Sequence, residues 1–244
     1  MAGASPDPAQ IIALLWGTRA RPSRAGISVP AIVEVAVALA DADGLDAVSM
    51  RAVADRAGVG TMTLYTHVPG KAELLMLMVD RVQGELYADV DEPTRQTGGW
   101  QGAMRFIAQR NLELLVTHVW LLELRRHRPV LGPNELVTYE AELRPLDGIG
   151  LDELAMDGVR SLVLAHVSGV ARAAADGAWA AEDSGMSDDD WWQATAPHLE
   201  AIDHSPFPVA SRVGQAAGER WGVSTPPEVA LAVGLDRILA GVEA

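Results

Sequence analysis

Residues 49–67 read Ser49-Met-Arg-Ala-Val-Ala-Asp-Arg-Ala-Gly-Val-Gly-Thr-Met-Thr-Leu-Tyr-Thr-His67, and this stretch decides the fold. Ser49 is a good N-cap for a first short helix, and Gly58 ends that helix before a second one begins. Two short helices joined by three or four residues can cross at the steep angle of a helix-turn-helix. The crossing requires a small residue, which Ala54 supplies, and the turn requires a positive φ, which Gly58 supplies. The pattern therefore predicts a helix-turn-helix with Leu64 in its small core.

The second helix of this motif presents a mainly polar face. A step of 100° per residue turns Leu64 toward the core and leaves an outward arc of polar side chains beside Met62. The helix is about 10 Å long and fits a major groove about 12 Å wide, where threonine hydroxyls and methyls can contact base edges. We therefore expect contacts with duplex DNA from Ser49, Arg51, Thr61, Met62, Thr63, Tyr65, Thr66, His67 and Lys71.

Lys71 is the only lysine in the chain and begins the next predicted helix. Free backbone N–H groups and the positive end of the helix dipole favour an anion at such a position. A solvated surface lysine is the alternative interpretation. The neighbouring Ser49, Tyr65 and His67 can donate to the same DNA backbone, so we favour a phosphate contact for Lys71.

Charge is distributed unevenly along the 244 residues. The formal net charge is −14, which by itself argues against a nucleic-acid partner. Residues 1–71, however, carry six basic and six acidic side chains, so the excess negative charge lies beyond them. Screening confines such interactions to about 8–10 Å in physiological salt, so a DNA-binding head on an acidic body is feasible. The cluster Arg19, Arg21 and Arg24 is compatible with an arm in a minor groove and equally with a solvated tail.

Composition and motifs argue against several classes of protein. The chain has no cysteine, hence no disulfide and no thiolate metal site. No stretch approaches about eighteen uninterrupted apolar residues, and the start lacks the basic segment of a signal peptide, so no membrane partner is expected. Nucleophile-elbow, phosphate-loop, zinc-protease and dinucleotide motifs are missing, and the histidines lack the spacing of a helical zinc site. We expect a cytoplasmic chain with no catalytic residues, no metal and no cofactor.

Helical patterns fill the chain and no strand pattern exceeds a few residues, which predicts an all-α fold. We expect a flexible basic arm over 1–27, a three-helix helix-turn-helix DNA-binding domain with a connecting helix (71–87) over 28–88, and a larger helical ligand-binding and dimerisation domain over 89–244. The first helix of the head follows the N-cap Ser28 and stops at Gly44. Much of 181–224 is expected to be irregular. Within 89–244 we expect helices near 100–117, 119–127, 134–146, 151–179, 187–200 and 227–241.

The order and spacing of short motifs in residues 28–88 resemble the N-terminal domain of the TetR (tetracycline-repressor) family. The resemblance implies an all-helical homodimer whose two heads sit in successive major grooves of double-stranded operator DNA. The motifs that carry it are Ile32–Ala36, Gly44-Leu45, Ser49–Ala54, Gly58-Val59, Thr63–Val68 and Lys71–Leu75.

Weaker similarity to the tetracycline-type branch continues, for example at Trp100-Gln101, Arg128-Pro129 and Ala165–Gly169. In that branch the ligand pocket lies within the C-terminal domain, and the last two long helices pair with their copies in a four-helix bundle. The small residues of 151–179 suit such a seam, although base composition alone could also produce them. The metal-liganding histidine of the drug-binding member was not found around 118–128, so the sequence does not support tetracycline with Mg²⁺ as the ligand.

Aromatic, histidine and polar side chains of the C-terminal part are candidates for the pocket, with plain core packing as the alternative for each tryptophan. We interpret the chain as a DNA-binding transcriptional regulator, a repressor that a small-molecule effector releases from its operator. The alternative is a regulator without a small ligand, controlled by a protein partner or acting constitutively. The expected ligand contacts are Phe106, Arg110, Trp120, His127, Asn134, His166 and Trp192.

Overall fold

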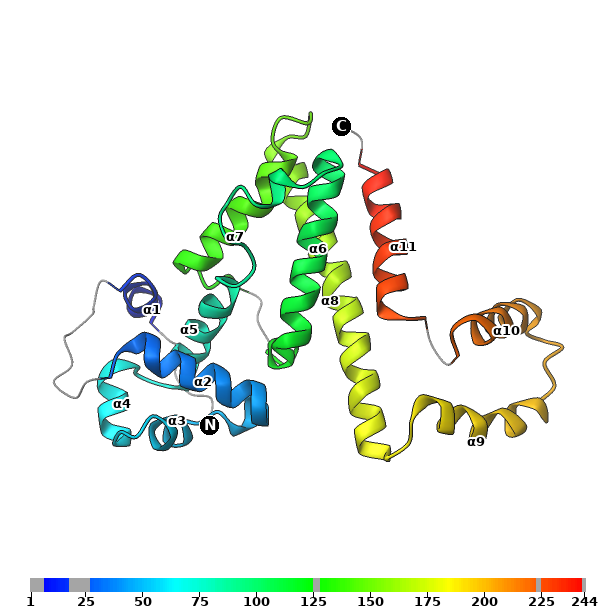
Figure 1. The fold of residues 1–244 in the computed structure, drawn as a ribbon, viewed down its shortest axis with the longest axis horizontal. Helices are drawn as coiled ribbons and strands as arrows, with labels where there is room; N and C mark the ends of the chain where they lie inside the picture. The colour runs from blue at the N-terminus through cyan, green and yellow to red at the C-terminus, as the bar shows by residue number, and fades with distance from the viewer. Residues whose placement is uncertain (1–6, 18–26, 125–127, 223–224, 243–244) are drawn as a thin grey trace. The chain divides into compact units, whose positions relative to one another are not determined.

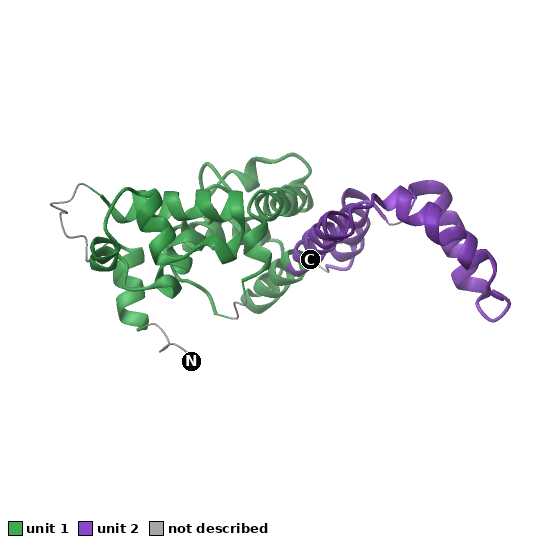
Figure 2. Ribbon diagram, turned by 90° about the horizontal axis from the view of Figure 1, so that it is seen from below, with its two compact units in different colours: residues 1–164, 244 green, residues 165–243 purple. Residues whose placement is uncertain are grey.

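The computed structural model describes residues 7–17, 27–124, 128–222 and 225–242. Every regular element in these ranges is a helix, which confirms the all-α prediction. The chain divides into two compact units, residues 1–164 and 165–243, with the terminal residue assigned to the first (Figure 2). The division falls within a long helix and not at the connection near residue 89, where the sequence predicts a domain boundary.

Three helices near the start of unit 1 form the predicted helix-turn-helix (Figure 1). Gly58 has a φ of 69°, the left-handed conformation that this turn requires. Ala54 and Leu64 are fully buried where the two short helices contact each other. The three helices are α2 (Val29–Asp43), α3 (Met50–Arg56) and α4 (Thr61–His67).

Helix α5 (Lys71–Gln83) connects this head to the rest of unit 1. It contacts α2 of the head and also α7 (Pro133–Leu143), so one straight element reaches both parts. The predicted helix over 100–117 is α6 (Gly99–Thr117). Single 3₁₀ turns complete the unit: η1 (Leu45–Ala47), η2 (Pro93–Arg95), η3 (Val119–Leu122) and η4 (Arg144–Leu146).

Two expectations for unit 1 are wrong. Residues 8–15, predicted as part of a flexible basic arm, form α1 (Pro8–Leu15), because Asp7 caps the helix and a proline is tolerated in its first turn. Of the helix expected over 119–127, the described residues 119–124 form only the 3₁₀ turn η3, and Glu123 and Leu124 after it are not helical.

Helix α8 (Glu153–Ser184) begins in unit 1, continues into unit 2 and is five residues longer at its end than predicted. It is followed by α9 (Asp188–Glu200), α10 (Pro208–Trp221) and α11 (Pro227–Ala240). Helix α10 was not predicted, because its two glycines and its leading proline are typical of a loop. Proline at the first helical position fits the helix, however, because its absent N–H has no partner there anyway.

The main apolar core lies in the head and extends into its neighbours. Ile32, Leu64, Leu74 and Met78 are fully buried in it. Trp120 of η3 belongs to the same cluster, so the chain beyond α6 also packs on the head.

Helix α8 is the one described helix that is long and apolar enough to cross a membrane by length and composition. Arg172 and Asp176 lie in its second half, and charges are costly in the hydrocarbon of a bilayer. Much of its apolar surface is exposed, including Leu154 and Leu162. This exposed apolar surface is therefore available for contact with another protein surface.

In unit 2, helices α8 and α11 approach closely at Gly234. A Cβ atom at this position would lie 2.1 Å from His166 Nε2, closer than any real contact. The same His166 nitrogen lies 3.2 Å from the Leu231 carbonyl oxygen, and because a carbonyl only accepts, His166 donates through Nε2. Gly234 therefore permits a hydrogen bond that ties the two helices together.

Replacing Gly234 with alanine is expected to lower the free energy of unfolding by about 1–3 kcal/mol, because the methyl group overlaps the His166 ring. Urea unfolding followed by circular dichroism measures the change. Gly177→Ala is the matched control: its Cβ meets open space in α8, so it should stabilise by about 0.5–1 kcal/mol. Equal effects of the two variants would contradict the close approach.

Candidate functional site

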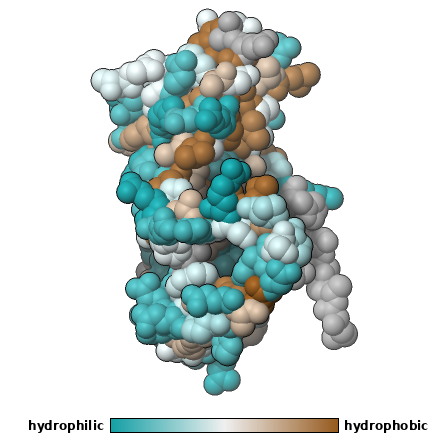
Figure 3. Space-filling model, turned by 90° about the vertical axis from the view of Figure 1, so that its right-hand side faces the viewer, coloured by the Kyte–Doolittle hydropathy of each residue, from teal (hydrophilic) through white to brown (hydrophobic). Residues whose placement is uncertain are grey.

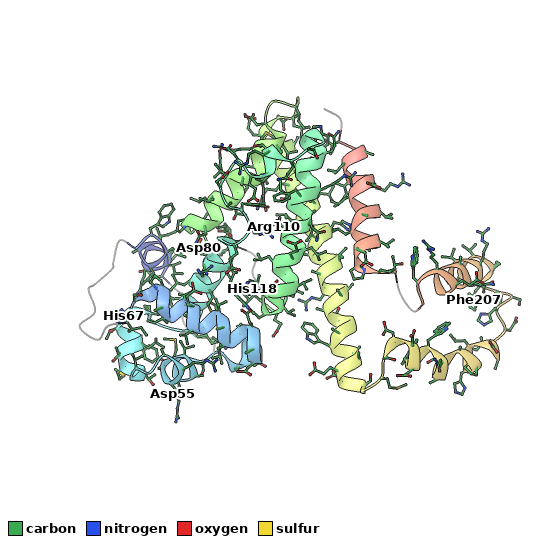
Figure 4. All side chains as sticks on the ribbon, viewed as in Figure 1. Asp55, His67, Asp80, Arg110, His118 and Phe207 are labelled. Atoms are coloured by element: carbon green, nitrogen blue, oxygen red, sulfur yellow. The ribbon has the colours of Figure 1, made fainter. Side chains whose placement is uncertain are left out.

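The outer face of α4 carries exposed side chains, as expected for a DNA-reading helix. Met62 is 78% exposed and Tyr65 is 44% exposed, both unusual for large apolar side chains. Thr66 is also exposed, whereas Thr63 is half-buried. Figure 4 places His67 on the same helix and Asp55 on α3, at the outer side of the head. The structure thus brings the predicted contact residues of α4 together on the surface of one short helix.

Two hydroxyl groups of the predicted DNA contacts, Ser49 before α3 and Thr66 on α4, already form hydrogen bonds within the protein. Ser49 Oγ accepts from the Ala52 N–H at 3.1 Å, so it caps α3 and keeps its own proton for another acceptor. Thr66 Oγ1 donates to the Thr63 carbonyl at 2.6 Å, so toward DNA it can only accept. Ser49 is consequently suited to a phosphate oxygen, and Thr66 to an amino group of a base.

The two predicted cationic contacts differ in their surroundings. Lys71 is exposed at the first position of α5, and its Nζ lies 3.5 Å from the Leu45 carbonyl oxygen. Arg51 is 87% exposed and only loosely paired with Asp55, at 3.8 Å. Both cations are therefore accessible to an anion. Arg19, Arg21 and Arg24 lie outside the described residues.

A cluster of polar side chains connects the segment after α6, at His118 and Trp120, to the head. His118, whose side chain is 5% exposed, places Nδ1 2.7 Å from Asp41 Oδ1 and Nε2 3.1 Å from Glu85 Oε2. Trp120 Nε1 donates to the same Asp41 oxygen at 2.8 Å. Arg81 pairs with Glu85 at 2.8 Å and with Glu34 of α2. Figure 4 shows His118 among the helices of unit 1, so α2, α5 and the end of α6 meet at this cluster.

Asp80 of α5 caps the start of α7. Its carboxylate accepts from the backbone N–H groups of Asn134 and Glu135, at 3.1 and 3.0 Å, and from Asn134 Nδ2 at 3.0 Å. The residue at the N-cap of α7, Gly132, has no side chain for this purpose. Burial raises the pKa of Asp80, while the N–H donors act in the opposite direction. The carboxylate therefore supplies across space the cap that the local sequence lacks.

Three of the predicted ligand contacts in unit 1 already have protein partners. Arg110 donates to the carbonyls of Glu85 and Leu86, both at 2.9 Å, and Trp120 is buried in the core cluster. Asn134 is committed to Asp80. Phe106 lies beside Tyr87, with ring centroids 6.3 Å apart. Their role as ligand contacts stays a prediction, but the first three have structural roles of their own.

The remaining predicted contacts lie elsewhere. His166 and Trp192 belong to unit 2, where His166 bonds Leu231 and Trp192 is exposed beside Trp191. His127 lies outside the described residues. Among the residues that the structure describes, no group of three or more histidine or acidic side chains is arranged to hold a metal ion.

A buried polar cluster in unit 1 is absent from the sequence-based set. Glu142 of α7 is fully buried and accepts from Tyr87 Oη at 3.0 Å, from Asn111 Nδ2 at 2.9 Å and from Arg160 Nε at 2.8 Å. Burial, reinforced by the Glu142 carboxylate, raises the pKa of Tyr87, so its hydroxyl remains a neutral donor. Donors from α6, from α8 and from the segment after α5 thus converge on one carboxylate of α7.

Gln83 Oε1 is the one buried side-chain polar atom, among the described residues, without a hydrogen-bond partner. The Gln83 carbonyl accepts from Thr138 Oγ1 at 3.3 Å, and Thr138 lies one helical turn before Glu142 on α7. A buried acceptor without a donor costs about 1–3 kcal/mol, so it calls for an explanation.

One sequence signal could have revealed this cluster. Thr138, Ala141 and Glu142 occupy the i, i+3 and i+4 positions of one helix face, and all three are buried. A glutamate within such a stripe must be paired, because burying an isolated carboxylate is very costly. The partners of Glu142 lie 18 to 55 residues away in the chain, so the sequence alone does not predict which residues pair with it.

Family comparisons agree with this architecture. Residues 32–77 match the family described as bacterial regulatory proteins, tetR family, and residues 92–244 match the tetracyclin repressor-like C-terminal domain. The chain belongs to the TetR family of DNA-binding transcriptional regulators.

Individual relatives narrow the comparison. The chain is 37% identical to the HTH-type transcriptional repressor DrrR1 of Streptomyces coeruleorubidus, over 98% of this chain and 87% of that protein. It is 30% identical to an HTH-type transcriptional regulator of Saccharopolyspora erythraea, over 78% and 76% of the two chains.

Among solved structures, ActR of Streptomyces coelicolor without ligand has a TM-score of 0.70 and 26% identity, covering 90% of this chain and 96% of that chain. ActR in complex with actinorhodin has a TM-score of 0.69 at the same identity, with 88% and 96% covered. The fold is therefore shared with a regulator that holds a small molecule.

Replacing Lys71 with alanine is expected to weaken operator binding and to flatten its salt dependence. One lost phosphate contact lowers the slope of log K against log salt by about 0.9. Binding isotherms at several salt concentrations, with a genomic fragment retained by the wild-type chain, measure the slope. Lys71→Arg keeps the charge and should keep the slope; an unchanged slope in Lys71→Ala would remove Lys71 from the phosphate contacts.

Proposed function

We propose that this regulator is a repressor that a small molecule releases from its operator. The observation that carries the proposal is the exposed outer face of α4, with Met62 at 78% exposure, on a TetR-family chain whose structural relative ActR binds actinorhodin. The protein acts by binding, in the cytoplasm, and not by catalysis.

On the DNA side, the proposed contacts are the nine residues predicted from the sequence. Met62 and Tyr65 offer apolar surface to thymine methyl groups and sugars, and Ser49 offers a donor to a phosphate. Lys71 and Arg51 supply the charges that hold the head on the backbone.

On the ligand side, we place the effector next to the Glu142 cluster. Gln83 Oε1 lacks a donor, and a small molecule carrying a hydroxyl or amino group beside it would remove that deficit. Phe106 and Tyr87 provide aromatic surface near the same cluster. The predicted contacts His166 and Trp192 of unit 2 and His127 remain further candidates.

Dimerisation is common to this family, and we propose α8 and α11 as its surface here. Leu154, Gly158, Leu162 and Gly169 are exposed along α8, and a Cβ at either glycine meets open space. Val233 of α11 is likewise exposed. Figure 3 shows apolar side chains at the surface among hydrophilic ones. Small and apolar exposed residues allow a second helix to approach closely.

The direct test has two steps. Genomic fragments retained by the purified chain identify the operator, and small molecules, beginning with actinorhodin, are then added to the complex. We expect an effector that binds the chain to release the DNA. To empty an operator, the effector must bind the conformation that does not hold DNA more tightly than the DNA-bound conformation, by several kcal/mol. If the chain stays on its operator with every molecule that binds the chain, the result would instead favour a regulator without a small ligand.

Gln83→Leu separates the effector site from the DNA site in the same assay. It removes the unpaired acceptor, so operator affinity should be unchanged while the releasing molecule binds about tenfold more weakly, the cost of one good hydrogen bond. Gln101→Leu, at an exposed position of α6, is the control and should alter neither quantity.

Leu162→Arg is expected to convert the dimer to monomers, because a charged side chain would be buried in the α8 contact. Sedimentation velocity measures the mass. Val116→Arg replaces a similarly exposed residue (56% against 53%) on α6 and should leave the dimer intact. A dimeric Leu162→Arg protein would refute α8 as the contact surface.

A further inference from the structure

Helix α1 is packed on the rest of unit 1, although it precedes the helix-turn-helix. Asp7 accepts from the Ala9 N–H at 3.0 Å, Ile11 is buried, and Leu14 and Leu15 lie against the core cluster of the head. The helix contacts α5. Eight residues do not form a stable helix alone in water, so this packing is what holds α1 in place.

Trp16, directly after α1, connects this helix to the loop that leads into α7. Its Nε1 donates to the Leu131 carbonyl at 3.1 Å, across 115 residues of sequence. Leu131 has a φ of 59° and is the one non-glycine residue with a positive φ in the described part of the chain. A leucine in this conformation is strained and persists only where its surroundings hold it.

Three helices hold that loop. Trp16 after α1 binds the Leu131 carbonyl, and Glu135 of α7 accepts from the Leu131 N–H. The Asp80 carboxylate of α5 lies so close to Gly132 that a Cβ there would be 2.0 Å from its oxygen. Val130 is buried in the core cluster of the head. The loop is therefore a joint between α1, α5 and α7.

We propose that α1 is a positioning element for DNA binding, and that Trp16 is the residue through which it acts. Helix α5 begins at Lys71 in the head and carries Asp80 one turn before its other end. By holding the 130–132 loop against α5, Trp16 fixes the orientation of α5, and with it that of the head, relative to α7. The inference rests on the proposed function, because it concerns how the head is presented to an operator.

Trp16→Phe tests the proposal, since it keeps an aromatic ring and removes the N–H donor. Operator affinity should fall about three- to tenfold, the range expected for one net hydrogen bond. In the DNA-free protein, hydrogen exchange of the segment 130–136 should accelerate, because the loop and the capped N–H groups of Asn134 and Glu135 lose their support. The operator probe is a genomic fragment that the wild-type chain retains.

Ile12→Ala is the control: this side chain is exposed on the same helix, so affinity should stay within about twofold and exchange should be unchanged. Unchanged exchange in Trp16→Phe overturns the proposal, and so does faster exchange with unchanged affinity. Weaker binding without faster exchange also overturns it, because Trp16 would then act by another route. A wild-type chain that retains no fragment would instead refute the proposed function, while the exchange measurement still decides whether Trp16 supports the loop.

Discussion

The Asp80 carboxylate is the interaction on which the rest of unit 1 depends. It accepts three hydrogen bonds from Asn134 and Glu135 in a buried setting, and it comes from the helix whose first residue is Lys71. A buried carboxylate is tolerable only when donors surround it, so α5 and α7 cannot separate without exposing or orphaning a charge. These hydrogen bonds hold α5 and α7 together, and the same two helices contact α1 and carry Glu142, respectively.

The helix-turn-helix was predictable because its determinants are local. Ala54, Gly58 and Leu64 lie within eleven residues, and each acts through its size or its backbone freedom. Helices α1 and α10 were not predicted, because each begins at a proline, Pro8 and Pro208, and proline is typical of loops. Proline disfavours the interior of a helix but fits its first turn, and a sequence alone does not show which position applies.

The internal polar clusters could not be predicted from the sequence, because their partners are remote. His118 joins Asp41 and Glu85 across 77 and 33 residues, and Tyr87 meets Glu142 across 55. Apolar packing tolerates small shifts of one helix against another, whereas such bonds fix direction and register. Arg110 and Asn134, which the sequence predicts as ligand contacts, also bond to other parts of the protein, and those remote partners could not be read from the sequence either.

The exposed apolar surface of α4 also has a thermodynamic consequence. Met62 and Tyr65 are hydrated in the free protein, and a DNA groove would remove water from both. Loss of hydrated apolar surface makes the heat capacity of a complex lower than that of its separate parts. In the proposed complex, the enthalpy of operator binding would then become more favourable on warming while its entropy would become less so, and the two changes oppose each other in the binding free energy.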